Sequence, residues 1–379
     1  MKAVIAAYAR STFHFATKGA LATTRPDTLA AQVVKGLMGR VDMDPALLED
    51  VILGCAYPEG PQGNNLARVV GFLAGLPQHV GGVTANRFCG SSMSAIHMAA
   101  AQIEAGIGEA YMCVGVESMT MVPQGGLTFD PSPDLIASYP DAYMPMGETA
   151  ENVAERWHVS RADQEALALS SHQKAAAARA QGLLADEIVP ITTPDGRVID
   201  ADGCIRPQTS LEALAGLKPA FRPTGVVTAG TSSPLTDGAA AVLVVHEDFA
   251  LQHGLTPLAR IRSFASIGVD PAVMGIGPVP ASIKALRRSG LAVDDLDLIE
   301  INEAFASQAL ACIRDLKLDV SKVNLDGGAL ALGHPLGATG ARITGKAASL
   351  LARTGGRYAL ATQCIGGGQG IATVLESLG

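Results

Sequence analysis

The sequence predicts an α/β fold of two similar α/β halves, with a loop domain inserted in the first half. Strand-like apolar runs alternate with helix-like amphipathic runs near both ends of the chain, and the order of these elements repeats. Between residues 119 and 234 the alternation stops, and the chain becomes rich in Pro, Gly and Asp. Alternating strands and helices favour parallel strand pairs covered by helices. We therefore expect an N-terminal half at 1–118 and 235–250, a loop domain at 119–234 that covers a site, and a C-terminal half at 251–379.

In the first half, short apolar runs predict buried strands. Two stretches with apolar residues at helical spacing predict helices at 27–38, with Asp27 as the N-cap, and at 91–105. The predicted strands are Val4–Tyr8, Val51–Cys55, Val83–Asn86, Ala110–Val116 and, after the inserted region, Asp237–Val245.

The C-terminal half repeats this pattern, with helices predicted at 280–288 and 336–352. In the inserted region, residues 153–157 and 163–179 are predicted to form surface-facing helices. The predicted C-terminal strands are Ala259–Val269, Leu298–Asn302, Arg357–Cys364 and Gly370–Leu375.

The composition excludes several classes of protein. With 48% hydrophobic and 17% charged residues, the 379-residue chain can bury a large core and is not disordered. Its net charge of −8 disfavours nucleic acid or an anionic membrane as the main partner. No run of 18 or more residues is continuously apolar, so we expect no membrane span.

The six cysteines are spread along the chain, and none forms a C-x-x-C pair. This spacing predicts free thiols in a reducing compartment and no bound metal. Residues 1–10 are interpreted as a buried strand, because their apolar stretch is short and no clear cleavage site follows. We expect a cytoplasmic protein. An organelle transit peptide, suggested by Arg10–Thr12 and Lys18, and an organelle matrix location are the eukaryotic alternative.

Cys89 lies in the segment Asn86–Ser92, after a predicted strand and at the start of a predicted helix. The positive end of a helix stabilises a thiolate and lowers the pKa of a cysteine. This position therefore predicts a nucleophile with a lowered pKa. The alternative is a small buried cysteine of the core.

His334 stands in the segment Gly333–Gly340, where glycine and proline fix the backbone ahead of a predicted helix. A positioned imidazole can take a proton from a thiol or donate a hydrogen bond to a developing enolate. A histidine that caps a turn is the alternative. Asn302 and Glu303 follow a predicted strand: Asn302 can hold a water, and Glu303 can orient a histidine or cap the next helix. The alternative for this pair is an ordinary helix start.

Cys364 ends an apolar strand and begins a turn with four glycines among residues 365–370. Such a turn can direct successive N–H groups into one site as an oxyanion hole. A nucleotide-phosphate loop is the alternative. It is disfavoured because residues 371–375 predict a strand, whereas such a loop opens a helix.

Together these motifs make the chain resemble the thiolase family over nearly all of its length. Among thiolases, the sequences of these motifs are most similar to those of the bacterial β-oxidation type. The resemblance implies a five-layered α-β-α-β-α fold and CoA-dependent cleavage of 3-ketoacyl-CoA through an acyl-cysteine. The segments that carry it are Asn86–Ser92, Thr228–Ser233, Gly230–Ala241, Met274–Ser282, Asn302–Phe305, Gly333–Gly340 and Cys364–Gly370.

The resemblance also implies a role for each motif residue. Cys89 would form the acyl-enzyme, and His334 would assist its deprotonation. Cys364 would protonate the acetyl-CoA enolate and then take the thiol proton of the incoming CoA. Asn302 would hold a water that binds the enolate oxygen together with His334. The N–H groups of Cys89 and Gly366 would hold the tetrahedral oxyanion.

CoA is implied as a co-substrate, with no tightly bound cofactor. Because CoA carries phosphates and the chain is acidic, a local cationic patch is needed. The candidates are Arg206, which matches a family position at the nucleotide end, and Lys218 and Arg222. For Lys218 and Arg222 the alternative is a solvated loop face.

Three more residues match family positions. Ser233 corresponds to a contact of the pantetheine arm, and Met146 and Met274 correspond to positions that line the acyl pocket. Ordinary core methionines are the alternative for the last two.

Pro145 marks a departure from short-chain biosynthetic thiolases, which carry a histidine before the Met-Gly of the loop domain. This favours longer acyl chains over the alternative within the family, an acetoacetyl-CoA thiolase working in the condensation direction. An acyl-CoA carrier without turnover is disfavoured because all four motif residues are present. A redox or metal protein is disfavoured because ligand-spaced pairs are missing. The resemblance further implies a homodimer or homotetramer, with a hydratase–dehydrogenase subunit of a β-oxidation complex as a further partner.

Overall fold

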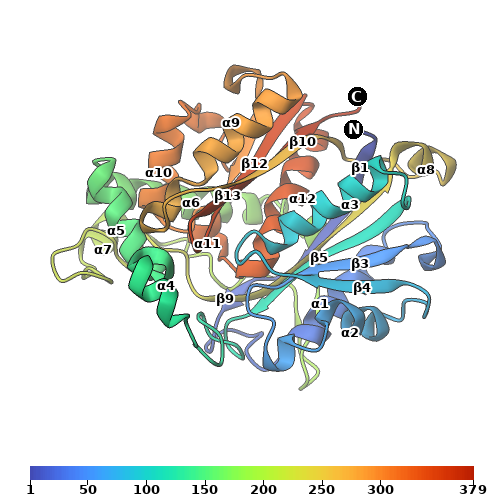
Figure 1. Cartoon of the computed structure of the whole chain (residues 1–379), viewed down its shortest axis with the longest axis horizontal. Coiled ribbons are helices and arrows are strands. Elements are labelled where there is room, and N and C mark those ends of the chain that lie inside the picture. Colours follow the sequence, from blue (N-terminus) through green and yellow to red (C-terminus); the bar gives the residue numbers. More distant parts are fainter.

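The computed structural model describes all 379 residues and contains one large sheet with helices packed on its faces (Figure 1). The N-terminal half supplies five of the longer strands and the C-terminal half supplies four. The strands are β1 (Ala3–Ser11), β2 (His14–Phe15), β3 (Asp50–Gly54), β4 (Gly81–Ala85), β5 (Ala110–Ser118), β6 (Ile188–Val189), β7 (Ile191–Thr192), β8 (Val198–Ile199), β9 (Thr236–His246), β10 (Ala259–Gly268), β11 (Leu298–Ile301), β12 (Tyr358–Ile365) and β13 (Gln369–Glu376).

Helices lie between the strands in both halves and fill the region between β5 and β9. The helices are α1 (Pro26–Met38), α2 (Leu66–Ala74), α3 (Ser91–Glu104), α4 (Pro133–Ser138), α5 (Met146–Arg156), α6 (Arg161–Ala180), α7 (Leu211–Ala215), α8 (Glu247–Gln252), α9 (Pro278–Ser289), α10 (Ala306–Asp315), α11 (Ala329–Leu332) and α12 (Leu336–Thr354). None of them is long and apolar enough to cross a membrane.

The sheet consists of two half-sheets with the same topology. Its order is β11-β12-β13-β10-β1-β9-β5-β3-β4, and the halves meet where β1 pairs with β10. In the N-terminal half, β4, β3 and β5 are parallel, and β9 is antiparallel to β5 and β1. In the C-terminal half, β11 and β12 are parallel, and β13 is antiparallel to β12 and β10. The counterpart of β4 is reduced to one parallel bridge between Ile299 and Val323.

Strand β9 shows how the layers form. Its odd-numbered residues from Ala239 to Val245 share a core with α1 and α2, and its even-numbered residues from Ala240 to Val244 share a core with α3 and α12. Side chains alternate between the faces of a strand, and a strand covered on both faces is apolar throughout. A third core joins α9 and α10 to the C-terminal half-sheet. The layers are therefore α1/α2, half-sheet, α3/α12, half-sheet and α9/α10, which confirms the predicted five-layered fold (Figure 1).

The two helices of the middle layer approach each other closely. A Cβ added to Gly340 of α12 would lie 2.3 Å from the backbone N of Met93 in α3, so a glycine is required there. The N–H of Ala341 also donates a hydrogen bond to Ser92 Oγ at 2.8 Å. This contact joins the first turn of α3 to the second turn of α12, and the motif residues Cys89 and His334 lie two residues before the starts of these helices.

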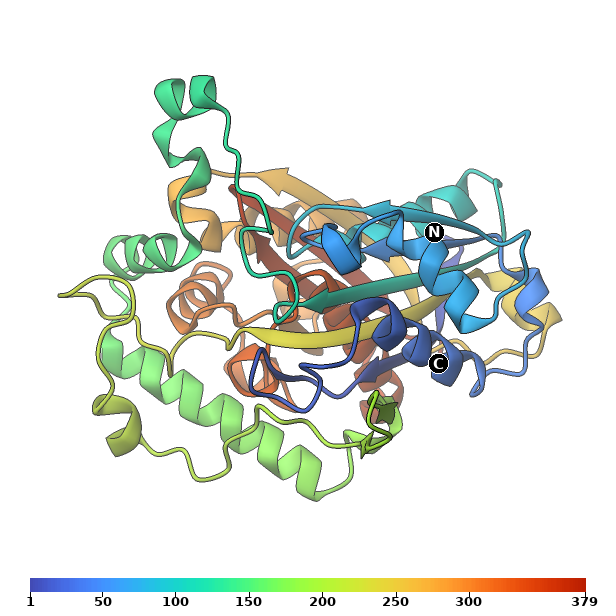
Figure 2. The same cartoon turned by 90° about the horizontal axis from the view of Figure 1, so that it is seen from below.

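The region between β5 and β9 contains two distinct structures. Helix α4 is part of an arm that projects from the body of the molecule, and α6 runs along the opposite side (Figure 2). The prediction that α6 faces the surface is only partly right. Ala168 and Ala175 pack against residues of α10 and α11, because this helix covers the C-terminal half.

Two further predictions need correction. Helix α1 begins at Pro26 and its N-cap residue is Arg25, so Asp27 lies inside the first turn and is not the cap. Its carboxylate instead accepts hydrogen bonds from the Arg25 side chain and the N–H of Thr28. Because proline is favoured at the first helical position, the helix starts one residue before the predicted start at residue 27. Helix α5 begins at Met146, seven residues before its predicted start.

Candidate active site

A cavity of about 520 Å³ lies between the two halves and the inserted region. Its walls include three of the four motif side chains, which come from the turn before α3, the turn before α12 and strand β12. Seven of the predicted site residues line it: Cys89, Arg206, Met146, Ser233, Met274, His334 and Cys364. Residues more than 270 positions apart in the sequence therefore meet in one space.

Cys89 sits in a sharp turn just before α3. Phe88 has a φ of +44°, a left-handed conformation that is unusual for a bulky residue, and Gly90 is the N-cap of the helix. The side-chain amide of Gln363, from the opposite half, donates a hydrogen bond to the Cys89 carbonyl. The turn is thus held from both halves of the molecule.

The pKa of Cys89 is raised to about 11, so the expectation of a lowered pKa is wrong for the unliganded site. Burial is the main cause, because it disfavours the charged thiolate. The N–H of Gly366 and the Cys89 N–H lower the pKa, but the Glu117 carboxylate raises it further. The donors that favour a thiolate are present, and desolvation outweighs them.

His334 is fixed by hydrogen bonds on both its backbone and its ring. Its N–H donates to Thr236 Oγ1 at 3.1 Å, and its Nδ1 lies 2.6 Å from Thr339 Oγ1. Since the Thr339 hydroxyl donates to the Pro335 carbonyl at 3.4 Å, it accepts from Nδ1–H, which leaves Nε2 without a proton. Burial, followed by the nearby Arg342 charge, lowers the pKa of His334 to about 3. The imidazole is therefore neutral in the resting site.

Asn302 is buried beside this ring at the end of β11. Its Nδ2 lies 3.4 Å from His334 Nε2, and its Oδ1 has no hydrogen-bond partner. A buried acceptor without a partner is costly unless a water or a ligand satisfies it. This unpaired oxygen fits the predicted water site.

Cys364 and Gly366 lie where β12 turns into β13. Burial raises the pKa of Cys364 well above its usual value, and a charge on Cys89 would raise it further, which reflects how near the two thiols are. The Gly366 N–H faces the Cys89 sulfur. The glycine turn therefore supplies a backbone donor and a second thiol to the same cavity.

Glu303 has a different role from the one predicted for it. Its carboxylate accepts hydrogen bonds from Ser171 Oγ at 2.7 Å, Asn324 Nδ2 at 2.7 Å and the N–H of Leu330 at 3.2 Å. It contacts neither His334 nor the first turn of the following helix α10. Instead it joins α6 to the first turn of α11, because the loop before α11 folds back over the end of β11.

Glu117 was missed by the sequence analysis. It is the penultimate residue of β5 and is fully buried. Its carboxylate accepts from the N–H groups of Ala56 at 2.8 Å and Gly337 at 2.9 Å and from Gln62 Nε2 at 2.8 Å. It thereby joins the loop after β3 to the first turn of α12, three residues after His334. A carboxylate directly after the apolar run at 110–116 was the available signal.

The two basic candidates Lys218 and Arg222 do not line the cavity. Arg222 is paired with Glu148 at 2.7 Å and donates to Asn152 at 2.6 Å, both on α5. Lys218 is exposed outside the cavity. Arg206 does line it, with its guanidinium 5.2 Å from the Phe15 ring centre, and Lys18 is a second basic residue in the lining that was not predicted.

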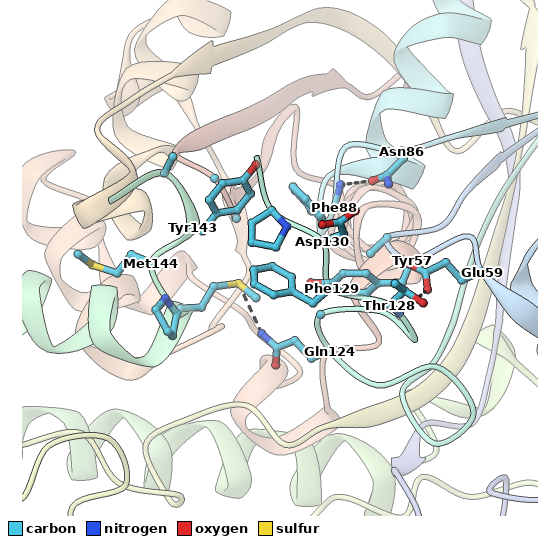
Figure 3. Close-up of a pocket in the computed structure, with 18 of the residues that line it drawn as sticks. Tyr57, Glu59, Asn86, Phe88, Gln124, Thr128, Phe129, Asp130, Tyr143 and Met144 are labelled. Atoms are coloured by element: carbon cyan, nitrogen blue, oxygen red, sulfur yellow. Dashed lines mark hydrogen bonds between the residues drawn. The ribbon is translucent and has the colours of Figure 1, made fainter. Parts of the chain in front are cut away.

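A second cavity of about 710 Å³ adjoins the first (Figure 3). The two share Gln124, Met146, Gly147 and Phe221 in their walls. The second is formed largely by the loop before α4 and the residues that lead into α5, together with Tyr57 and Phe88. No cluster of three or more His, Cys, Asp or Glu side chains that could hold a metal ion occurs in the protein.

Comparisons with known proteins identify the family of the chain. The thiolase N-terminal domain model matches residues 3–248, and the thiolase C-terminal domain model matches residues 255–377. The chain is 46% identical to a 3-ketoacyl-CoA thiolase of Bacillus subtilis over 99% of both chains. It is 46% identical to a 3-oxoadipyl-CoA/3-oxo-5,6-dehydrosuberyl-CoA thiolase of Escherichia coli over 94% of this chain and 95% of that one.

Among solved structures, human mitochondrial 3-ketoacyl-CoA thiolase in complex with CoA superposes with a TM-score of 0.91. The two sequences are 39% identical over 99% of this chain and 98% of the human one. Both domain models and the full-length relatives agree with the five-layered fold. The chain belongs to the thiolase family.

Proposed function

We propose that this protein is a 3-ketoacyl-CoA thiolase that cleaves its substrate with CoA to give acetyl-CoA and an acyl-CoA shorter by two carbons. The observation that carries the proposal is the meeting of two thiols and a neutral imidazole in one cavity, with Arg206 in its wall. Acyl transfer between thioesters through a cysteine needs a nucleophile, a base and oxyanion donors. Full-length relatives with this activity support the assignment.

In the first half-reaction, Cys89 attacks the 3-keto carbon while its proton moves to Nε2 of His334. The Cys89 thiol with a pKa of about 11 and the imidazole with a pKa of about 3 are both neutral at rest, so proton transfer accompanies attack. The N–H groups of Cys89 and Gly366 donate to the oxyanion. Each such donor contributes about 2–4 kcal/mol to lowering the barrier.

Collapse of the tetrahedral intermediate breaks the bond between C2 and C3 of the substrate. The electron pair passes to the enolate of acetyl-CoA, and the Cys364 thiol protonates its carbon. The protonated His334 and a water on Asn302 Oδ1 donate to the enolate oxygen. Acetyl-CoA then leaves, and the acyl group stays on Cys89 as a thioester.

In the second half-reaction, a new CoA gives its thiol proton to the Cys364 thiolate and attacks the acyl carbon. The bond between that carbon and Cys89 breaks, and the thiolate of Cys89 recovers the proton held by His334. All protons and electrons are then in their starting positions. This covalent scheme gives ping-pong kinetics.

Binding of CoA is assigned to Arg206 and Lys18 at the phosphates and to Ser233 at the pantetheine arm, with Met146 and Met274 beside the acyl group. Arg222 is omitted because Glu148 already pairs with it. We further propose that the N-terminal half comprises residues 1–118 and 235–250, the loop domain residues 119–234 and the C-terminal half residues 251–379. We also propose a homo-oligomer that is located in the cytoplasm, where two catalytic thiols stay reduced.

The test is CoA-dependent cleavage of acetoacetyl-, 3-ketohexanoyl- and 3-ketooctanoyl-CoA. We expect cleavage of the longer substrates and its loss in Cys89→Ala. The matched control is Cys113→Ala, because Cys113 is buried in β5 and its thiol faces the Ala95 carbonyl, away from the cavity. Cleavage of acetoacetyl-CoA alone would identify a short-chain thiolase. No cleavage of any substrate would leave an acyl-CoA carrier.

A further inference from the structure

We propose that the second cavity takes the part of the acyl chain beyond the 3-keto group, and that it selects uncharged tails against tails that end in a carboxylate. The inference rests on the proposed function. The proposal specifies the chemical class of the acyl tail. The relatives do not specify it, because one is named for 3-ketoacyl-CoA and another for 3-oxoadipyl-CoA, whose tail ends in a carboxylate.

The second cavity begins next to the reacting sulfur. Gly366, whose N–H faces Cys89, lines the second cavity, and Met146 lines both cavities. A Cβ added to Gly366 would lie 3.4 Å from Met146 Sδ, so the passage between the cavities runs beside a glycine. An acyl group on Cys89 can therefore extend into the second cavity. The first cavity, with Lys18 and Arg206, suits the CoA phosphates.

The walls of the second cavity are largely aromatic and apolar (Figure 3). Two ring pairs form part of the wall, Tyr57 with Phe88 and Phe129 with Tyr143, each with ring centres 5.9 Å apart. Such surfaces gain free energy from each methylene group that leaves water. At about 0.8 kcal/mol for each buried methylene, we expect kcat/KM to rise about fourfold per added carbon until the cavity is full.

The charged side chains of the second cavity disfavour an anionic acyl tail. Glu59 and Asp130 line the cavity, and no Lys, Arg or His does. Glu59 is held in place by the N–H groups of Leu127 and Thr128, at 2.6 and 3.3 Å. A terminal carboxylate in this cavity would lose water, find no cation and face two like charges.

Two substrates of equal length isolate this effect, 3-ketohexanoyl-CoA and 3-oxoadipyl-CoA, which differ by a methyl or a carboxylate at the end of the chain. We expect kcat/KM for the first to be about 30-fold higher or more. Equal values with both substrates would overturn the proposal and leave the thiolase function intact. Loss of cleavage with both, and with acetoacetyl-CoA, would overturn the function itself.

A charge reversal tests the site directly. Asp130 has an exposed side chain, so Asp130→Lys should fold normally, as a thermal melt will check. We expect it to raise kcat/KM for 3-oxoadipyl-CoA relative to 3-ketohexanoyl-CoA by about tenfold. Asp134→Lys is the matched control, because it makes the same charge change on α4 outside the cavity lining and should leave the ratio unchanged. An unchanged ratio in Asp130→Lys, or an equal change in Asp134→Lys, would overturn the proposal.

The apolar wall has its own test. Phe129→Ala removes one ring of the pair with Tyr143. In the wild type, kcat/KM should rise about 16-fold from 3-ketohexanoyl- to 3-ketooctanoyl-CoA, because two more methylenes are buried. In Phe129→Ala we expect this rise to be about eightfold or less. If Phe129→Ala keeps the full gain, the tail does not contact this wall.

Discussion

The two halves of the molecule share a topology and present different chemistry at equivalent places. The turn before α3 carries Cys89 in the N-terminal half, and the turn before α12 carries His334 in the C-terminal half. The penultimate residue of strand β5 is the carboxylate Glu117, and the penultimate residue of its counterpart β12 is the thiol Cys364. One half therefore presents the proposed nucleophile, and the other presents the groups proposed to move protons.

Because the groups are divided in this way, the site depends on how the two halves join. Neither half contains a complete set of groups, and the contact between α3 and α12 at Gly340 brings the two turns together. The Cys89 carbonyl is held by Gln363 of the other half, and Gly337 of the other half is held by Glu117. Each half thus holds a motif-bearing turn of the other half in place.

The comparison predicts the largest effect at the nucleophile. Cys89→Ala should lower turnover by about 10⁴-fold or more, because no acyl-enzyme can form. Mass spectrometry after incubation with substrate should show an acylated peptide at Cys89 in the wild type and none in the variant. If the variant is still acylated at another cysteine and turns over normally, the division of roles between the halves is wrong.

A smaller and more selective effect is expected from the C-terminal half. Cys364→Ala should lower carbon–carbon cleavage by about 10³-fold, in the range for loss of a general acid–base. It should still allow partial acylation of Cys89 by a simple acyl-CoA. Exchange of the methyl hydrogens of acetyl-CoA with deuterated water, followed by NMR, should disappear in Cys364→Ala and persist in Cys113→Ala. Normal exchange in Cys364→Ala would contradict the assigned role.

Glu117→Gln sharpens the comparison because it changes the link between halves without removing a motif residue. The amide keeps the size of the side chain but has only one acceptor oxygen. It therefore loses either Oε2, which accepts from the N–H groups of Ala56 and Gly337, or Oε1, which accepts from Gln62 and the Tyr57 N–H. We expect a loss of about 1–3 kcal/mol in the free energy of unfolding. Since the carboxylate charge raises the pKa of Cys89, the variant should show a lower thiol pKa in the pH dependence of alkylation. A higher pKa, or none of these changes, would contradict the proposed link.

The smallest effect concerns two neutral histidines, one in each half. The pKa of His97, on α3, is lowered to about 3 by burial, like that of His334. Between about pH 4 and 6 the unfolded chain binds a proton at each of these residues and the folded protein does not, so each makes stability fall as the pH falls. The change approaches about 1.4 kcal/mol per pH unit for each histidine.

His97→Gln isolates one of these contributions. His97 Nε2 lies 2.8 Å from Thr373 Oγ1, a contact that glutamine can replace. In urea unfolding at pH 4, 5 and 6, the variant should lose less stability than the wild type as the pH falls. His253→Gln is the control, since His253 is not among the buried residues. Equal slopes for His97→Gln and the wild type would show that His97 is protonated in the folded protein.

Much of the fold was predictable because its signals are local. Apolar runs without alternation predicted the strands β5, β9 and β12, which are covered on both faces, and helical spacing predicted α1, α3 and α12. The motif segments at 86–92, 302–305, 333–340 and 364–370 were also recognised in the sequence, and their catalytic roles remain predictions. The short strands and α11 were not predicted, because they depend on neighbours distant in the chain.

Which groups are available, and which family the chain resembles, could be read from residue identity and spacing, because both are local properties. The ionisation and pairing of those groups depend instead on the folded arrangement of the whole chain. Burial raises the pKa of Cys89 although this residue precedes a helix. Arg222 forms an ion pair with Glu148, and Glu303 accepts hydrogen bonds from Ser171 and Asn324 instead of contacting a histidine. Desolvation and pairing depend on which distant residues pack around a side chain. Those neighbours exist only once the two halves have folded against each other.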